Sequence, residues 1–124
     1  DGMREVAQLL GITTAEVRAV ATFYTMLRTE RTGRHVVCVC TNLSCALVGS
    51  DRVLEAFEAE LGVTAPGTSA DGAITLRCVE CLGGCGWGPV VSVDEEYEEH
   101  FQIEDVAPLV ERLRSASRPS ESHA

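Results

Sequence analysis

Four cysteines in two short clusters are the residues of this chain whose types and spacing point most directly to chemistry. The first cluster reads Cys40-Thr-Asn-Leu-Ser-Cys45, and the second reads Cys81-Leu-Gly-Gly-Cys85. A [2Fe-2S] cluster is held by four thiolates, and two short loops that a fold brings together can supply two sulfurs each. We therefore consider Cys40, Cys45, Cys81 and Cys85 as ligands of one iron-sulfur centre.

Two other uses of the cysteines compete with this interpretation. Structural zinc also accepts four thiolates, but its usual closely spaced cysteine pairs need no glycine-rich loop such as residues 83–88. Such glycines suit a cluster, because backbone without side chains can approach the sulfides and donate N–H bonds to them. A disulfide framework of six cysteines is disfavoured, because a chain of 124 residues can bury an adequate core and shows no export signal. The iron-sulfur centre is the favoured interpretation, and the other two stay open at this point.

Six cysteines for four positions leave an assignment problem. Cys38 is predicted to be a small buried side chain inside a strand, whereas Cys78 forms a Cys-x-x-Cys pair with Cys81 that would itself suit a metal. The choice of Cys81 and Cys85 rests on the glycine-rich loop and on the family resemblance given below. His35 could supply a nitrogen ligand, but it lies at the far end of a strand and is expected to be a partly exposed side chain.

Length and charge limit the classes of function. A chain of 124 residues should form one domain with a helical appendage, and its net charge of −9 argues against nucleic acid and favours protein partners. No apolar run approaches the roughly 18 residues of a membrane span, so no direct membrane insertion is expected. The acidic run 94–99 could be a docking patch for a basic partner, but a solvated hairpin turn is the favoured interpretation.

The first 34 residues are predicted to be a helical segment and linker. Apolar residues at helical spacing begin at Met3, and Gly11 is a plausible stop. The sequence from Thr13 to Glu16 fits a capping box at the start of a second helix. The apolar stripe of this second helix is expected to comprise Val17, Val20, Ala21, Tyr24 and Leu27. A helix-turn-helix could bind DNA, but the segment carries too few basic residues to neutralise phosphates.

From residue 35 the pattern changes to an α/β arrangement. Strands are predicted at 35–40, 74–77, 90–93 and 97–101, so that both cysteine clusters follow a strand. Ser50 or Asp51 can cap a helix that ends at Gly62, and its apolar face is expected to comprise Val53, Leu54, Phe57 and Leu61. A last helix over 103–114 should direct Ile103, Val106, Val110 and Leu113 inward.

This order of elements predicts an α/β sandwich of the thioredoxin type over residues 35–114, followed by a disordered tail at 115–124. Pro89 precedes the third strand, where such folds often carry a cis proline. The redox Cys-x-x-Cys of thioredoxins is absent at the first helix. The spacing from Cys40 to Cys45 instead indicates a metal, because a thiol pair that forms disulfides needs closer sulfurs.

At these residues the chain resembles the NuoE-type subunit of respiratory complex I, a small thioredoxin-like [2Fe-2S] ferredoxin domain preceded by helices. The matching stretches are 21–26 (Ala-Thr-Phe-Tyr-Thr-Met), 40–45, 49–50, 71–72 and 79–86, with Pro89 beyond. The resemblance covers nearly the whole chain, and it is shared with the diaphorase modules of NAD-dependent formate dehydrogenases and hydrogenases. Departures are Cys38 and Cys78, which permit ligand rescue after mutation. A shorter N-terminal helical region suggests truncation or a surface completed by other chains.

The resemblance implies that Cys40, Cys45, Cys81 and Cys85 bind one [2Fe-2S] cluster in an electron-transfer subunit of NADH:quinone oxidoreductase. The cluster would exchange electrons with FMN in an NADH-oxidising flavoprotein subunit, while this chain would bind neither NADH nor FMN. No catalysis is expected from the isolated chain, and no dinucleotide-binding glycine motif follows a strand. The complex would be peripheral on the inner membrane, on its cytoplasmic side. Alternatives are the equivalent subunit of a formate dehydrogenase or hydrogenase, or a free-standing thioredoxin-like ferredoxin.

Overall fold

The computed structural model describes residues 2–117 and divides into two compact units, residues 1–31 and 32–124. Residues 32–34 group with the second unit because Gly33 donates its N–H to the Thr75 hydroxyl at 2.7 Å, and Arg34 donates its N–H to the Gly72 carbonyl. The proposed limits of the domains, 1–34 and 35–114, stay a prediction. The predicted disordered tail, 115–124, lies outside the described residues from position 118 onward.

Two helices make up the first unit: α1 spans Gly2–Leu10 and α2 spans Thr14–Phe23. Gly11 ends α1 with a φ of 67°, a left-handed conformation that glycine adopts without strain. The predicted capping box is confirmed, because Thr13 donates its N–H to Glu16 and the Glu16 N–H donates to the Thr13 hydroxyl. The hydrogen bond from the Thr13 N–H, followed by one from the Thr13 hydroxyl to the same carboxylate, lowers the pKa of Glu16.

Helix α2 ends earlier than its apolar stripe predicts. Tyr24 already has extended backbone, and Leu27 lies beyond the helix. Aromatic and β-branched residues are poor helix formers, and Phe23, Tyr24 and Thr25 follow one another here. No residue of α2 is fully buried within the described structure: Val17 and Ala21 of the stripe are half-buried, and Val20, Tyr24 and Leu27 are exposed.

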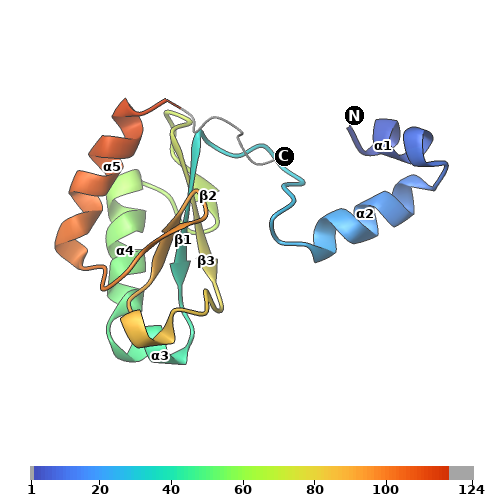
Figure 1. Ribbon diagram of the computed structural model, residues 1–124. Helices are drawn as coiled ribbons and strands as arrows, with labels where there is room; N and C mark the ends of the chain where they lie inside the picture. Colours follow the sequence, from blue (N-terminus) through green and yellow to red (C-terminus); the bar gives the residue numbers. More distant parts are fainter. Residues whose placement is uncertain (1, 118–124) are drawn as a thin grey trace. The chain divides into compact units, whose positions relative to one another are not determined.

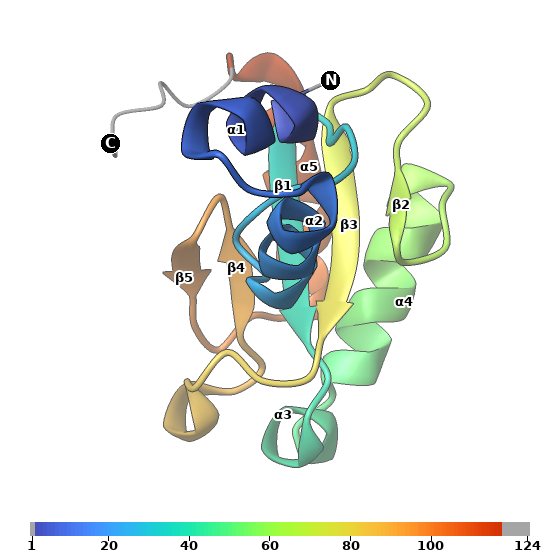
Figure 2. The ribbon, with the colours of Figure 1, turned by 90° about the vertical axis from the view of Figure 1, so that its right-hand side faces the viewer.

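A mixed five-stranded sheet forms the centre of the second unit, with strands in the order β2-β3-β1-β4-β5 (Figure 2). The strands are β1 His35–Cys40, β2 Gly67–Thr68, β3 Ile74–Val79, β4 Val91–Val93 and β5 Glu96–Glu98. The helices are α3 Leu43–Leu47, α4 Ser50–Leu61 and α5 Val106–Ser115, with 3-10 turns η1 Cys85–Trp87 and η2 Ile103–Asp105. Helices α4 and α5 cover one face of the sheet (Figure 1).

Strands β1 and β3 run parallel, with His35 opposite Ile74 and Cys40 opposite Val79. Both strands therefore end at the same edge of the sheet. The alternating residues of the strands that face α4 and α5 form the core, where the rings of Phe57 and Phe101 stack with centroids 5.6 Å apart. The core includes Val37, Val39, Val53, Leu61, Leu76, Val91, Val106, Leu109, Val110 and Leu113. Among the described residues, no helix is long and apolar enough to cross a membrane.

Helix α4 confirms its predicted face and its predicted end but not its predicted cap. Gly62 ends it with a φ of 65°, as expected. At the start, however, Gly49 in the left-handed conformation is the N-cap, and no side chain caps the helix. The prediction of Ser50 or Asp51 as the cap is therefore wrong. Ser50 is instead fully buried, and its hydroxyl has no hydrogen-bond partner among residues 2–117.

The hairpin and the last helix are shifted from their predicted bounds. Strand β5 comprises Glu96–Glu98 rather than 97–101, because the tight turn consists of Asp94 and Glu95, both with positive φ. The last helical stretch begins as a 3-10 turn, and Ile103 in that turn is exposed, which contradicts its predicted inward position. The Gly88–Pro89 peptide is cis, as predicted.

His35 is buried, with 3% of its surface exposed, so the expectation of a partly exposed side chain is wrong. Its Nδ1 lies 2.6 Å from the Asp94 carboxylate, which also accepts the Val36 N–H at 2.8 Å. Asp94 therefore joins the hairpin turn to the start of β1, and it is not free to form part of a docking patch.

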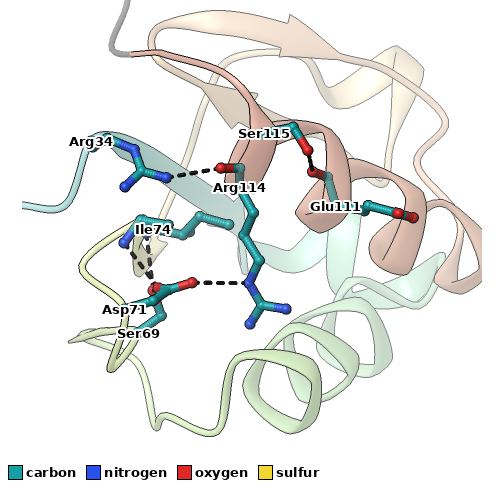
Figure 3. A network of polar contacts seen from close by, with 8 residues as sticks. Arg34, Ser69, Asp71, Ile74, Glu111, Arg114 and Ser115 are labelled. Carbon is teal, nitrogen blue, oxygen red and sulfur yellow. Dashed lines mark hydrogen bonds and ion pairs between the residues drawn. The ribbon is translucent and has the colours of Figure 1, made fainter.

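A polar network joins the loop before β3 to the end of α5 (Figure 3). Asp71 accepts hydrogen bonds from the Ser69 hydroxyl and from the Ala73 N–H, and it lies 3.2 Å from Nε of Arg114. Arg34, directly before β1, donates to the Arg114 carbonyl. The Ser69 and Ala73 hydrogen bonds, helped by the two arginines, lower the pKa of Asp71.

Replacing Asp71 by asparagine is expected to lower the melting temperature at neutral pH. A carboxyl whose pKa is lower in the folded state contributes stability above its unfolded pKa of about 3.9, and loses that contribution as the pH falls through the folded value. The difference from wild type should therefore shrink below about pH 3.9. Thermal unfolding monitored by circular dichroism over this range tests the prediction, with Glu99→Gln as the control on an exposed carboxylate. A difference that grows on acidification would contradict it.

Candidate iron-sulfur centre

The structure places the two cysteine clusters at one end of the sheet (Figure 2). Cys40 is the last residue of β1, and Cys45 lies in the short helix α3. Cys81 follows the end of β3, and Cys85 begins the turn η1. The parallel pairing of β1 with β3 brings the clusters together, because both strands deliver their next residues to the same edge.

The thiol of Cys45 is influenced by the thiols of Cys40 and Cys85. Burial is the largest cause that raises the pKa of the Cys45 thiol, and the neighbouring thiols of Cys40 and Cys85 raise it further. A backbone hydrogen bond from Val90 opposes this effect. Neighbouring thiolates repel one another when no cation is present. A bound iron offsets this repulsion, because it coordinates the sulfurs in their deprotonated form.

Val90 and Gly88 shape the space around these sulfurs. Val90 is fully buried, and its carbonyl accepts the Cys40 N–H at 3.1 Å. A Cβ on Gly88 would lie 3.3 Å from the Cys45 Sγ and 3.1 Å from a methyl of Val48. The chain from Gly88 to Val90 therefore passes closer to Cys45 than a larger residue at position 88 would allow.

Cys81, the fourth candidate, lies in the exposed loop after β3. Its sulfur accepts the N–H of Gly83 at 3.2 Å. The carbonyl of Glu80, one residue earlier, accepts from the Cys40 thiol at 3.9 Å, so the start of the second cluster lies beside the first. Cys40 and Cys45 are buried and Cys81 and Cys85 are exposed, which gives the centre an inner pair and an outer pair.

The two remaining cysteines lie in the strands. Cys38 pairs with Arg77 across β1 and β3 and is half-buried rather than fully buried as predicted. It lies, with Cys40, on the sheet face opposite the one that carries the core residues Val37 and Val39. Cys78 is exposed near the end of β3. Among the described residues, none of the six cysteines forms a disulfide with another.

The donor set fits a binuclear iron cluster. Among residues 2–117, no group of three or more His, Cys, Asp or Glu side chains is placed to hold one metal ion. Each iron of a [2Fe-2S] cluster needs only two protein thiolates, since bridging sulfides complete its coordination. Four cysteines in an inner and an outer pair fit this requirement.

Exposed apolar side chains lie on the segments that carry Cys45 and Cys85. Leu43, Leu47 and Val48 extend from α3 and its end, and Trp87 extends from η1. Leu47 is 79% exposed and Trp87 is 53% exposed. Val48 and the Gly88 that follows Trp87 lie close together, so the two groups are neighbours. We call these four residues the apolar collar, and large exposed apolar groups of this kind are typical of protein interfaces.

Sequence reasoning missed three parts of the site. Helix α3 is too short for its period to be recognised, although Asn42 is a typical cap and accepts the Leu43 N–H. Val90 was recognised only as a strand residue, because backbone hydrogen bonds carry no sequence signal. Tyr97, whose hydroxyl donates to the Leu82 carbonyl inside the second cluster, was assigned only to a strand.

Comparison with known families settles the class of protein. The family model described as thioredoxin-like [2Fe-2S] ferredoxin matches residues 1–114. The chain belongs to this family. Its fold class is therefore the predicted one, an α/β thioredoxin-like ferredoxin domain preceded by a short helical segment, and the cofactor that goes with it is one [2Fe-2S] cluster. Zinc and a disulfide framework are no longer competing interpretations.

Named relatives of this ferredoxin belong to an oxidoreductase complex. The chain is 44% identical over 114 residues to the E subunit of the NADH-quinone oxidoreductase of Mycobacterium tuberculosis, covering 92% of this chain and 45% of that protein. It is 41% identical to the second E subunit of the same enzyme in Rhizobium meliloti, covering 94% of this chain and 69% of that protein. The chain thus spans less than half the length of the mycobacterial relative, and the predicted resemblance to complex I subunits is confirmed.

Solved structures share the fold. A thioredoxin-like [2Fe-2S] ferredoxin from Aquifex aeolicus has a TM-score of 0.57 at 25% identity, over 73% of this chain and 88% of that one. An NAD+-reducing [NiFe]-hydrogenase chain has a TM-score of 0.84 at 14% identity, over 99% of this ferredoxin and 21% of that chain. At that identity the second likeness shows the fold alone.

Proposed function

We propose that this ferredoxin is the electron-transfer subunit that carries one [2Fe-2S] cluster beside an FMN-containing, NADH-oxidising subunit of NADH:quinone oxidoreductase. Cys40, Cys45, Cys81 and Cys85 are the proposed ligands. The observation that carries the proposal is that the parallel pairing of β1 with β3 brings the two cysteine clusters to one end of the sheet, where the Cys40 thiol lies 3.9 Å from the Glu80 carbonyl beside Cys81.

The roles of the four ligands differ with their burial. The bound cluster supplies uptake and release of one electron at a time. Cys40 and Cys45 hold its inner side against the end of the sheet, where Val90 bonds to both residues. Cys81 and Cys85 hold its outer side on a loop that solvent reaches. Electrons would therefore enter or leave through the outer side, where the distance to a partner is shortest.

Two exposed apolar regions support a fixed partner rather than free diffusion. The apolar collar lies on the two segments that carry Cys45 and Cys85, where an electron donor must approach. In the first unit, Leu9, Phe23 and Met26 are also largely exposed. Interfaces are enriched in aromatic and methionine side chains, and a carrier without a partner has no use for such residues on its surface. A flavoprotein subunit of a peripheral complex on the inner membrane is the proposed partner.

Two alternatives belong to the same chemistry. The equivalent subunit of an NAD-dependent formate dehydrogenase or hydrogenase would have the same cluster and a similar flavoprotein. A free-standing ferredoxin would have the cluster alone. The NADH-quinone oxidoreductase relatives at 44% and 41% identity favour complex I. In each case the chain contributes electron transfer to an enzyme and no catalysis of its own.

The purified chain is expected to be brown, with visible charge-transfer bands and stoichiometric iron and sulfide. Reduction with dithionite should produce the paramagnetic signal of a reduced [2Fe-2S] cluster, because one added electron leaves an odd electron count. Absorption and electron paramagnetic resonance spectra of anaerobically purified protein test this prediction. Colourless protein with stoichiometric zinc would overturn the proposed cofactor and function together.

Association with the proposed flavoprotein subunit needs a separate measurement. Co-expression with the flavoprotein of the same complex, followed by gel filtration, should give one peak that contains both chains and FMN. A variant with Leu47→Ser and Trp87→Ser should form this complex more weakly than the wild type, although the variant chain keeps its cluster. Elution of the cluster-bearing chain alone would favour the free-standing ferredoxin.

A further inference from the structure

Tyr97 and Cys81 are bonded to opposite sides of one peptide group. The Tyr97 hydroxyl donates to the carbonyl of Leu82. The N–H of Gly83 donates to the Cys81 sulfur at 3.2 Å. The Leu82 carbonyl and the Gly83 N–H belong to the same peptide bond, which is planar and trans, so that they point in opposite directions. The atoms therefore form a chain from the phenol, through the peptide, to the sulfur.

We propose that Tyr97 is a positioning residue that holds the Leu82–Gly83 peptide with its N–H directed at the Cys81 sulfur, and so raises the reduction potential of the centre. The inference rests on the proposed function, since it takes Cys81 as a ligand. Hydrogen bonds to the sulfurs are among the features that set the potential of iron-sulfur clusters. A donor stabilises the more negative, reduced state more than the oxidised state.

The loop needs such a restraint because the peptide could otherwise turn. Gly83 has a φ of 77°, and a Cβ built on it would meet no atom within 4 Å. Glycine crosses between backbone conformations with little steric cost. Without a bond to its carbonyl, the Leu82–Gly83 peptide could direct its N–H to solvent instead of to sulfur. The Tyr97 hydroxyl removes this freedom from the carbonyl side.

Tyr97 is itself fixed relative to the loop. Strand β5 pairs it with Ser92 of β4. After β5, the His100 N–H donates to the Trp87 carbonyl at 2.8 Å, and the Phe101 N–H donates to the Pro89 carbonyl at 2.9 Å. Together with the bond from Tyr97 to Leu82, these two hydrogen bonds join the segment 97–101 to the second cysteine cluster and the residues after it. The phenol is held in place by the sheet rather than by the loop it restrains.

The hydrogen bond from Tyr97 also strengthens the bond from the Gly83 N–H to the Cys81 sulfur. When the carbonyl of a peptide accepts a hydrogen bond, the peptide is polarised and its N–H becomes a better donor. Loss of the phenol would thus weaken the N–H to sulfur bond even where the peptide keeps its orientation. A turned peptide and a weaker N–H donor would both make the reduction potential more negative. The expected direction of the shift is therefore the same in the two cases.

Tyr97→Phe in the full chain, purified with its cluster, tests the inference. We expect full iron and sulfide content and a reduction equilibrium shifted three- to tenfold toward the oxidised state, which is about 30 to 59 mV more negative for a one-electron couple. The principal g-values of the reduced cluster should shift as well. Tyr24→Phe is the matched control, because Tyr24 is equally exposed, at 50%, and its hydroxyl has no hydrogen bond within the described residues.

A second variant keeps the inference testable if Tyr97→Phe binds its cluster poorly. The sequence has two tyrosines, so growth of the Tyr24→Phe variant on difluorotyrosine labels position 97 alone. The fluorinated phenol is more acidic and a stronger donor, and the potential should become less negative. An unshifted potential in either substitution, with the cluster intact, overturns the role of Tyr97 alone. Wild-type protein without a [2Fe-2S] cluster would overturn the role of Tyr97 and the proposed function together.

Discussion

Replacing Cys45 by alanine is expected to leave the chain without a stable [2Fe-2S] cluster. Cys45 is 2% exposed, and its sulfur interacts with Cys40 of its own cluster and with Cys85 of the other. Changes in residues that only support metal ligands typically reduce affinity about 10- to 100-fold. Loss of a proposed ligand should exceed this range, because it removes a direct bond to iron rather than a supporting contact. Iron content, sulfide content and the visible spectrum of the purified variant measure the effect.

Cys78→Ala is the matched control for this experiment. Cys78 is an exposed thiol near the end of β3 and is not one of the proposed ligands. The control should keep the spectrum, the iron content and the potential of the wild type. If Cys78→Ala lost the cluster while Cys45→Ala kept it, the proposed ligand set would be wrong. Thermal unfolding of both variants without iron would separate loss of a ligand from loss of the fold.

The parts of the fold that follow from local pattern were predictable. The strand 35–40 is a continuous apolar run, as expected for a strand with neighbours on both sides, and it has the predicted bounds. Helix α4 has its predicted face because Val53, Phe57 and Leu61 recur at helical spacing. Gly62 ends it because a left-handed residue is needed there. In these elements, local preference and tertiary packing agree.

The predictions that were wrong concern residues whose surroundings are decided by tertiary contacts. His35 was expected to be partly exposed, but Asp94, distant in the sequence, provides the partner that makes its burial tolerable. Ser50 has the chemistry of a helix cap, yet the chain enters α4 through Gly49, and the serine is buried instead. Ile103 has the correct spacing for an inward position, but a 3-10 turn rotates it out of the helical register.

The position of the two cysteine clusters in the fold was predictable, and their surroundings were not. Cysteine spacing and the glycine-rich loop identified two clusters, and the strand before each cluster predicted a common edge of the sheet. The contacts that shape the site are made by backbone groups, such as the Val90 carbonyl and the Gly83 N–H. Backbone groups are the same in every residue, so the sequence does not reveal which of them bond to the ligands.

Replacing Gly84 by leucine is expected to release the cluster or shift its potential. A Cβ at position 84 would lie 2.9 Å from a methyl of Val90, closer than two such carbon atoms can approach. Val90 is fully buried, and its β-branched side chain has few alternative rotamers. Its carbonyl accepts the Cys40 N–H, and it also forms a hydrogen bond to Cys45. Overpacking of this kind typically costs about 1–3 kcal/mol, and here the displacement would reach both inner ligands.

Gly86→Leu provides the matched control, because it adds the same side chain to the same loop. A Cβ at position 86 would meet no atom within 4 Å, and Gly86 is not among the glycines with positive φ. The control should therefore keep its cluster with an unchanged potential, whereas Gly84→Leu should lose iron faster on dilution into a chelator. Equal rates of iron loss in the two variants would mean that Val90 does not hold the inner ligands. The burial of Cys40 and Cys45 alone would then account for the stability of the site.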